Sequence, residues 1–318
     1  LARGLKQDVT FHTKIIENEK VMIDNQFIGK LKGLKLELDL KIGTLDTDIK
    51  SLKKAARQSI GPEFSKRIKQ IIETELLEIK NDFKIYWNNF PIARLQPGRD
   101  YLEPEISLIV DDIIESGEQK KLKDYLEKWL KEKINIVLKS LIDLKSLKEK
   151  NSSIRALAYQ LYENNGVLKR ERVSDYLNKL GQEERKILRN LGVKFGRYHV
   201  FLFKLLKPES VLLRILLWKN YNQKHLNLNP PKFGLNFIED TYTKNKNFML
   251  LCGFENFDKC FVRIDILERL FIQIINTNKE LKDNNKEVKL IPEMLNLLGC
   301  SKENFKKLIQ NMNYKIYE

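Results

Sequence analysis

The chain has 318 residues, and its 58 Lys and Arg against 43 Asp and Glu give a formal net charge of +15. Its 42% of hydrophobic residues exclude a disordered chain, and 14 Gly and 8 Pro exclude collagen-like and low-complexity classes. Three Cys without a close pair exclude a disulfide framework and a zinc ribbon, so we expect a reducing, cytoplasmic compartment.

The ends and the apolar runs bear on targeting. The opening residues lack the apolar core of a signal peptide, and the longest apolar runs fall well short of the roughly 20 residues that a membrane helix needs. We therefore expect no membrane partner. Because the sequence begins at Leu1 and not at Met, we also expect a fragment or a shortened form of a longer protein.

The first 150 residues contain an internal repeat with a spacing of 64. Segments 20–31 and 84–95 share their apolar positions, and each predicts two short strands around an Asn-centred turn. A helical periodicity follows each copy. We predict a duplicated antiparallel β/α module over 1–150, with repeats near 20–80 and 84–148. The aromatic residues Tyr86 and Trp87 would either pack in its core or stack on bases.

The middle of the chain is predicted to be helical. Apolar periodicity with Ser and Gly at the ends indicates helices over 154–163, 173–180 and 182–191. These define a basic helical domain over 151–225, followed by a Pro- and Asn-containing linker over 226–247.

The last part, 248–318, is predicted to be winged-helix-like. Two short strands near 248–254 and 260–264 lead into a helix over 266–276. Two helices separated by a Gly-containing turn follow, and a closing strand ends the chain, which is the order of a helix-turn-helix with a wing. The fold class expected overall is α+β, mainly helical.

The positive charge is concentrated in one segment. Residues 151–250 carry a formal charge of +10, whereas 1–100, 101–150 and 251–318 carry +5, −1 and +1. A localised basic segment is typical of a nucleic-acid contact. A general enrichment in Lys on a solvated surface is the competing interpretation.

The segment 169–207 is the main candidate for that contact. Its basic residues are interleaved with aromatic ones, which suits phosphate neutralisation and base stacking on a single strand. Phe195, Phe201 and Phe203 would either stack or belong to the core. The candidate nucleic-acid-binding residues are Lys169, Arg170, Arg172, Lys194, Arg197, Tyr198, His199, Lys204 and Lys207.

Secondary candidates lie on the last helix, where Lys302, Lys306 and Lys307 either contact nucleic acid or form a solvated face. No catalytic centre is predicted. The sequence lacks the phosphate-binding loop, the nucleophile elbow, the H-E-x-x-H pair and paired Cys motifs, and its three His are scattered. We therefore assign no catalytic residue, no metal ligand and no cofactor to this chain.

Several runs resemble a known family. Gly-Val-Lys-Phe-Gly-Arg-Tyr-His at 192–199, Val-Arg-Ile-Asp-Ile-Leu-Glu-Arg-Leu at 262–270 and Pro-Glu-Met-Leu-Asn-Leu-Leu-Gly-Cys at 292–300 are the longest. Together with Ile-Arg-Ala-Leu-Ala-Tyr-Gln-Leu at 154–161 and Pro-Ile-Ala-Arg-Leu at 91–95, they resemble the C-terminal, non-motor region of bacterial superfamily II DNA/RNA helicases of the mitochondrial-degradosome type.

That resemblance implies an accessory region of an ATP-dependent RNA or DNA helicase. The motor domains would lie upstream in the same polypeptide, and ATP and Mg²⁺ would belong to that motor. We expect a non-catalytic region that contacts RNA or DNA, single-stranded, through its basic segment. The alternative is a protein-docking scaffold that links a helicase motor to a nuclease or a ribonucleoprotein partner. The duplicated module and the balanced charge at both ends of the chain favour that alternative.

Overall fold

The computed structural model describes residues 13–16, 19–23, 26–39, 46–74, 76–149, 152–224, 226–239, 245–281 and 287–317. The described residues are 53% helical and 22% strand, with several small antiparallel sheets, so the predicted α+β class is confirmed. It divides into an N-terminal part, 1–132 with 220–222, and a C-terminal part, 133–219 with 223–318. The predicted boundary at 150 therefore lies inside the C-terminal part.

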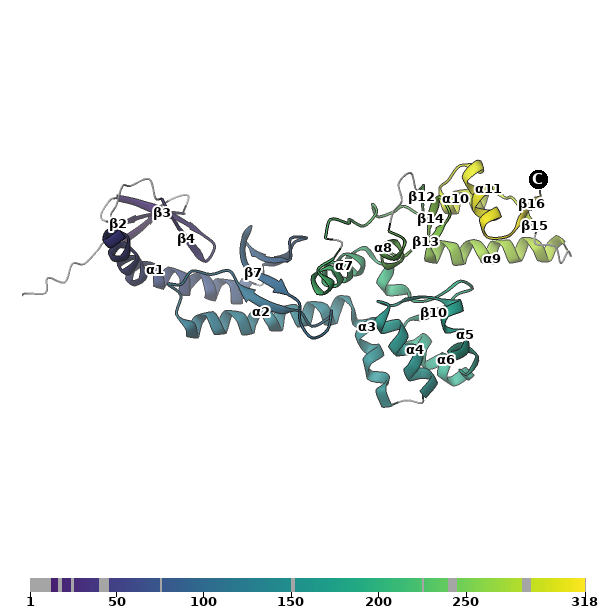
Figure 1. Cartoon of the computed structure of the whole chain (residues 1–318), viewed down its shortest axis with the longest axis horizontal. Helices are drawn as coiled ribbons and strands as arrows, with labels where there is room; N and C mark the ends of the chain where they lie inside the picture. The colour runs from purple at the N-terminus through teal and green to yellow at the C-terminus, as the bar shows by residue number, and fades with distance from the viewer. Residues whose placement is uncertain are drawn as a thin grey trace, which may run out of the picture. The chain divides into compact units, whose positions relative to one another are not determined.

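The N-terminal part holds two four-stranded antiparallel sheets, each followed by a long helix (Figure 1). The elements of the first copy are β1 (Thr13–Ile16), β2 (Lys20–Ile23), β3 (Gln26–Lys32), β4 (Lys35–Leu38) and α1 (Asp46–Thr74). Those of the second copy are β5 (Leu77–Ile79), β6 (Lys84–Trp87), β7 (Phe90–Gln96), β8 (Glu105–Leu108) and α2 (Ser116–Val137).

The two sheets repeat each other down to an irregularity in register. A bulge lies between Val21 and Met22 where β2 pairs with β3, and another lies between Ile85 and Tyr86 where β6 pairs with β7. These two places are equivalent in the sequence repeat, where Val21 aligns with Ile85. A bulge is a specific feature of a strand pair, so its recurrence indicates a true structural duplication.

The second copy shows how the Asn-centred turn works. Asn88 and Asn89 both have positive φ, at 46° and 65°, the geometry that a two-residue hairpin needs. The equivalent turn at 24–25 lies outside the described residues. Trp87 is buried, so the core interpretation holds for it, whereas the half-buried Tyr86 donates its hydroxyl to Asp82 Oδ2 at 2.7 Å.

The C-terminal part contains three successive units that follow one plan. After α3 (Lys139–Ile142) and the 3-10 helix η2 (Asp143–Glu149), the units begin with α4 (Ser152–Glu163), α7 (Pro208–Asn222) and α9 (Ile264–Leu281). These three helices start at even intervals along the chain. We call 152–207, 208–263 and 264–317 the first, second and third units.

Each unit continues with a short strand and one or two helices. The first has β9 (Val167–Lys169), η3 (Arg170–Val173), α5 (Ser174–Asn178), α6 (Gln182–Asn190), β10 (Val193–Phe195), β11 (His199–Leu202) and η4 (Phe203–Leu206). The second has β12 (Phe237–Glu239), α8 (Lys246–Leu251), β13 (Phe254–Phe257) and β14 (Cys260–Arg263). The third has β15 (Glu287–Lys289), α10 (Pro292–Leu298), α11 (Lys302–Asn311) and β16 (Lys315–Tyr317).

The sheets of the first two units have the same register. In the first, the strand order is β10-β11-β9, and Val193 pairs with Leu202. In the second, the order is β13-β14-β12, and Phe254 pairs with Arg263 at the equivalent place in the hairpin. The order helix, strand, helix pair and hairpin, with the last strand in the middle of the sheet, is that of a winged helix. The first unit follows it fully.

The third unit departs from the predicted winged helix in one respect. Its helix pair and closing strand lie where the sequence indicates, but β16 pairs in parallel with β15. Among the described residues, no hairpin follows α11. The hairpins of the C-terminal part lie instead in the first two units.

Three predictions for this part were wrong. The basic domain is not wholly helical, because it contains the β9–β11 sheet. The predicted linker contains β12, which pairs with β14. The predicted strand at 248–254 is mostly α8, because Asn245 Oδ1 accepts the Phe248 backbone N–H at 2.9 Å and caps a helix whose apolar side chains are buried.

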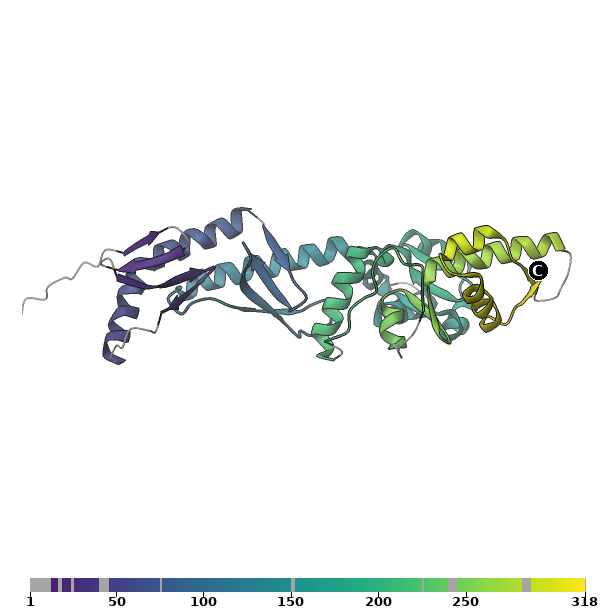
Figure 2. The same cartoon turned by 90° about the horizontal axis from the view of Figure 1, so that it is seen from above.

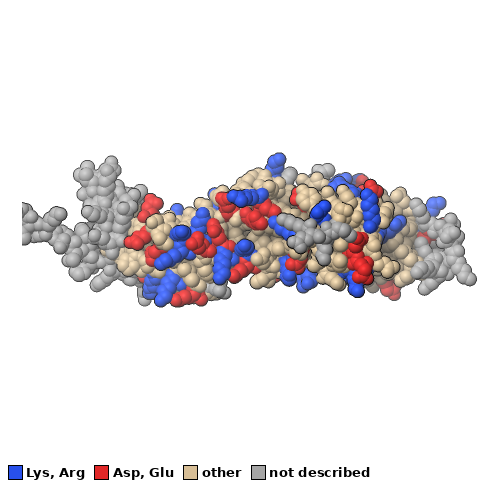
Figure 3. Space-filling model, turned by 90° about the horizontal axis from the view of Figure 1, so that it is seen from below, with Lys and Arg blue, Asp and Glu red and all other residues tan. Residues whose placement is uncertain are grey.

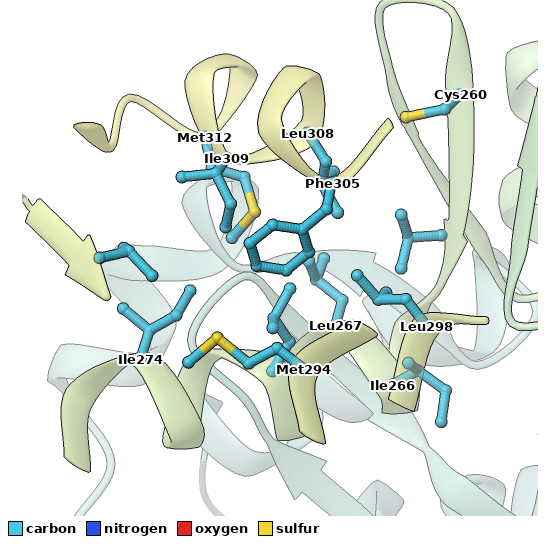
Figure 4. Close-up of a cluster of buried hydrophobic side chains, with 13 residues drawn as sticks. Cys260, Ile266, Leu267, Ile274, Met294, Leu298, Phe305, Leu308, Ile309 and Met312 are labelled. Atoms are coloured by element: carbon cyan, nitrogen blue, oxygen red, sulfur yellow. The ribbon is translucent and has the colours of Figure 1, made fainter. Parts of the chain in front are cut away.

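The third unit packs around one apolar cluster. Figure 4 shows the Phe305 ring of α11 at the centre of this cluster, near Leu267 and Met294. Figures 1 and 2 both place α10 and α11 against α9. Cys260 and Val262 of the second unit belong to the same cluster, so the second and third units share a core.

Candidate nucleic-acid interface

The helix pair of the first unit is held by side chains of α6. Glu184 accepts the backbone N–H of Gly181 at 2.6 Å and so fixes the start of the helix. Arg185 donates to the carbonyls of Leu177 and Leu180 at 2.6 and 3.3 Å, which satisfies the end of α5.

The hairpin of this unit packs on α6 through Phe195. The guanidinium groups of Arg185 and Arg189 each lie 5.6 Å from the centre of its ring. Phe195 is therefore half-buried beneath two cations, whereas Phe201 is buried in the core and Phe203 is 46% exposed. Among these three aromatic residues, only Phe203 is exposed to solvent.

Five of the nine candidate residues line one pocket of about 670 Å³. All three units contribute to its wall: the first through η3 and the β10–β11 turn, the second through the β13–β14 turn and the third through Asn311. The five candidates are Lys169, Arg170, Arg197, Tyr198 and His199.

The other four candidates do not line this pocket. Arg172, Lys194, Lys204 and Lys207 are exposed on η3, β10, η4 and the residue before α7. They are available to a phosphate backbone without any change of fold.

The secondary candidates on α11 also differ in exposure and in whether they line a pocket. Lys302 and Lys307 are exposed and Lys306 is half-buried. Lys307 lines a second pocket of about 520 Å³ between α11 and the hairpin of the second unit.

His199 lines the pocket, but its side chain is almost entirely buried and is held within the protein, unlike the surface contact that the sequence predicts. Its side chain is 1% exposed, with Nε2 2.6 Å from Glu255 Oε2 and Nδ1 3.8 Å from Glu268 Oε1. Burial lowers its pKa, but the two carboxylates outweigh burial, and the net pKa is raised above the ordinary value. His199 is thus buried between two carboxylates that favour its protonated form.

Glu255, which also lines the pocket, contacts two basic side chains. Lys169 Nζ lies 2.9 Å from its Oε1, and His199 holds its Oε2. Burial raises the pKa of Glu255, but hydrogen bonds from His199 and Lys169 lower it more, so this carboxylate stays ionised. The Lys169 ammonium group is therefore already ion-paired with Glu255 of the same chain.

Glu268 of α9 fixes the turn between β10 and β11. Its carboxylate accepts the backbone N–H groups of Arg197, Tyr198 and His199 at 2.5, 2.9 and 3.1 Å. Burial raises the pKa of Glu268, but His199 and these N–H groups lower it more, and the net pKa is lowered. A Cβ at Gly196 would lie 2.3 Å from this carboxyl group, so glycine there lets the carboxylate stay close to its three N–H donors.

The remaining pocket residues are held by the same turn. Arg170 Nη1 donates to the Gly196 carbonyl at 2.8 Å, and the Arg197 guanidinium lies 5.7 Å from the Phe271 ring centre. Tyr198 meets Phe271 edge-on, with 5.5 Å between ring centres. Burial and the neighbouring Tyr314 raise its pKa, so the phenol stays protonated.

The charge of the surface is mixed. On the face shown in Figure 3, Lys and Arg side chains are interspersed with Asp and Glu side chains over the described residues. The surplus of positive charge in 151–250 therefore does not appear as a single field on that face.

Sequence reasoning missed the basic residues of α6 and the two carboxylates. The i, i+4 pair Arg185 and Arg189 could have been found, because that spacing places both on one helix face. Glu255 and Glu268 could not, since each lies far along the chain from the histidine that it contacts.

The described residues include potential metal ligands and three thiols. They contain no group of three or more His, Cys, Asp or Glu that could hold a metal ion. Burial raises the pKa of Cys252 and Cys260 to about 12 and that of Cys300 to about 11, which keeps these thiols protonated.

None of the described helices has the length and apolarity to cross a membrane. Neither protein-family models, nor curated proteins, nor solved structures match this chain.

Proposed function

We propose that this chain binds single-stranded RNA or DNA through its first unit, as a non-catalytic accessory region of a cytoplasmic ATP-dependent helicase. The observation that carries the proposal is the winged-helix order of 152–202, with α6 and the β10–β11 hairpin presented together. Winged helices share their helix pair with the helix-turn-helix proteins that use the second helix to bind nucleic acid.

Charge supports the same surface. Arg172, Lys186 and Lys194 are exposed on η3, α6 and β10, and the segment around them holds two-thirds of the net charge. Neutralising phosphates releases counterions, so binding should weaken steeply as salt rises. The helicase context rests on the resemblance of the runs at 192–199, 262–270 and 292–300.

The test is fluorescence anisotropy with labelled single-stranded RNA, single-stranded DNA and duplex DNA at several salt concentrations. The variant Arg172→Ala/Lys186→Ala/Lys194→Ala should bind about tenfold or more weakly. Its slope of log K against log salt should fall by about 2 on a single strand, since each contact contributes about 0.7.

A matched control removes the same charge elsewhere. Lys120, Lys121 and Lys131 are exposed on α2, in the segment whose net charge is −1. Their triple Ala variant should keep the wild-type affinity and slope. Equal losses in both triple variants would show that binding follows total charge and not the first unit, and the proposal would fail.

The second candidate is a scaffold that docks the helicase motor or a nuclease. The exposed apolar side chains of Leu226, Phe233 and Leu235, which lie close together in the sequence, favour it. Replacing Phe233 and Leu235 by Ser should then abolish co-elution with the upstream motor segment supplied as a separate polypeptide, without changing nucleic-acid affinity.

A further inference from the structure

The pocket shared by the three units has no role in the surface contacts proposed above. We infer that it takes one unstacked nucleotide of a bound single strand, an inference that rests on the proposed function. Its volume of about 670 Å³ lies within the range of roughly 300–1,000 Å³ typical of small-molecule sites. A base that is paired within a duplex cannot enter a pocket, because it must first leave the stack.

The pocket offers two guanidinium groups for a phosphate. Arg170 and Arg197 both line it, and among the described residues neither forms an ion pair with a carboxylate. By contrast, Lys169 and His199 are already paired with Glu255. Guanidinium groups suit phosphate because their planar forks donate two parallel hydrogen bonds.

Other residues of the pocket lining suit a base. Phe257 is a half-buried aromatic of the β13–β14 hairpin, and Asn311 ends α11 with an exposed amide. The carboxylates of Glu171 and Asp258 also line the pocket. They disfavour phosphate on their side but accept hydrogen bonds from the exocyclic amino group of a base such as cytosine. The nucleotide would therefore lie with its phosphate toward the two arginines and its base toward Phe257.

Two buried carboxylates hold several of the residues that line the pocket. Glu268 holds the backbone of Arg197 and Tyr198, while Glu255 holds Lys169 and His199 from below. Both sides of the pocket are thus set before a ligand arrives, which reduces the entropy lost on binding.

Two experiments test the inference with the full chain. Saturation-transfer difference NMR with CMP, AMP and UMP should show transfer to the base protons, and inorganic phosphate alone should compete weakly. Short single-stranded oligonucleotides that carry one 5-iodouracil should crosslink on irradiation to Phe257 or Tyr198, as mapped by mass spectrometry.

Variants make the result specific. Arg197→Ala and Asn311→Ala are exposed changes that should each weaken oligonucleotide binding about three- to tenfold and remove the CMP signal. Lys232→Ala, an exposed change outside the pocket, should alter neither. Circular dichroism should be the same for all three variants.

The outcomes separate the two proposals. Salt-dependent oligonucleotide binding without mononucleotide binding, and with crosslinks only outside the pocket, would overturn the inference and leave the proposed function standing. Mononucleotide binding without oligonucleotide binding would support the pocket and overturn the proposed function. Absence of both would overturn both.

Discussion

His199 Nε2 lies 2.6 Å from Glu255 Oε2, and this contact joins β11 of the first unit to β13 of the second. Glu268 of the third unit approaches the other nitrogen of the same ring at 3.8 Å. One buried histidine side chain of the first unit thus lies between carboxylates of the second and third units.

Stability should depend on pH through His199. Its pKa is raised in the folded state above the ordinary value of about 6.5, so its contribution is fully present below pH 6.5 and is lost as pH rises through the folded pKa. Urea unfolding of wild type and His199→Gln between pH 5.5 and 9 should give a difference in unfolding free energy of about 3 kcal/mol at the acid end that shrinks toward the alkaline end. A difference that is constant over this range would show that the pKa of His199 is the same in the folded and unfolded protein, and one that grows toward the alkaline end would show that folding favours the neutral form.

The acidic partner should show the opposite dependence. The pKa of Glu255 is lowered in the folded state, so its stabilisation is present above its ordinary pKa of about 4.3 and is lost as pH falls through the folded value. Glu255→Gln should destabilise the protein by about 3 kcal/mol or more at pH 7, because it leaves His199 facing one carboxylate fewer. Glu78→Gln, an exposed change in β5, serves as the control and should alter stability by less than about 0.5 kcal/mol.

The effects of substitutions at Gly196 and Glu268 on stability should not be additive. An added Cβ would push the carboxylate from its three N–H donors, so Gly196→Ala and Glu268→Ala should each cost about 2 kcal/mol and the double variant little more than either. Gly117→Ala is the control, since a Cβ there meets nothing within 4 Å and the residue lies in α2. Additive losses at 196 and 268, measured by urea unfolding, would contradict the contact.

Arg214 of α7 should be irreplaceable by Lys. The side chain is fully buried and donates to the carbonyls of Asn165, Leu205 and Leu251, which lie at or near the ends of α4, η4 and α8. Arg214→Lys retains the charge but not the planar fork, and Arg214→Leu removes both, so we expect losses of about 2 and 4 kcal/mol. Thermal unfolding of the full chain measures both, and a Lys variant as stable as wild type would show that charge alone suffices.

Gly192 and Gly253 offer a matched pair in the duplicated hairpins. Both precede the hairpin and have positive φ, at 92° and 89°, so Ala should cost about 1 kcal/mol at either position. A Cβ at Gly253 would also lie 2.6 Å from Leu206 Cδ2, whereas one at Gly192 meets nothing within 4 Å. Gly253→Ala should therefore be the more destabilising by about 1 kcal/mol in urea unfolding. Equal losses would mean that Leu206 moves aside.

Local patterns predicted those parts of the fold that depend on local interactions. The repeat in the N-terminal part follows from the shared pattern of 20–31 and 84–95, and Ser301 and Pro292 mark the starts of α11 and α10. The second repeat escaped notice because its members share geometry more than residues. Val193 and Phe254 occupy the same place in their sheets, yet their neighbours differ. Backbone register is not readable from side-chain identity when the core positions exchange one apolar residue for another.

The charge pattern of the sequence predicted the candidate site, and the burial of His199 in the structure changed the role assigned to that residue. Five of the nine candidate residues line one pocket and four do not, and the position of His199 depends on Glu255 and Glu268, which belong to later units of the chain. The residues next to a histidine in the sequence do not show whether it lies between two carboxylates or on the surface. The distinction arises only from tertiary contacts.

The junction between the second and third units has a consequence for synthesis on the ribosome. Arg263 ends β14 and Ile264 begins α9, while Cys260 and Val262 pack in a cluster made mostly by later residues. Those two side chains leave the ribosome before α10 and α11 exist. At about 5–20 residues per second, they wait roughly 3–11 seconds for the chain that covers them. A chain that ends with the second unit would therefore expose two apolar side chains that the third unit covers in the complete fold.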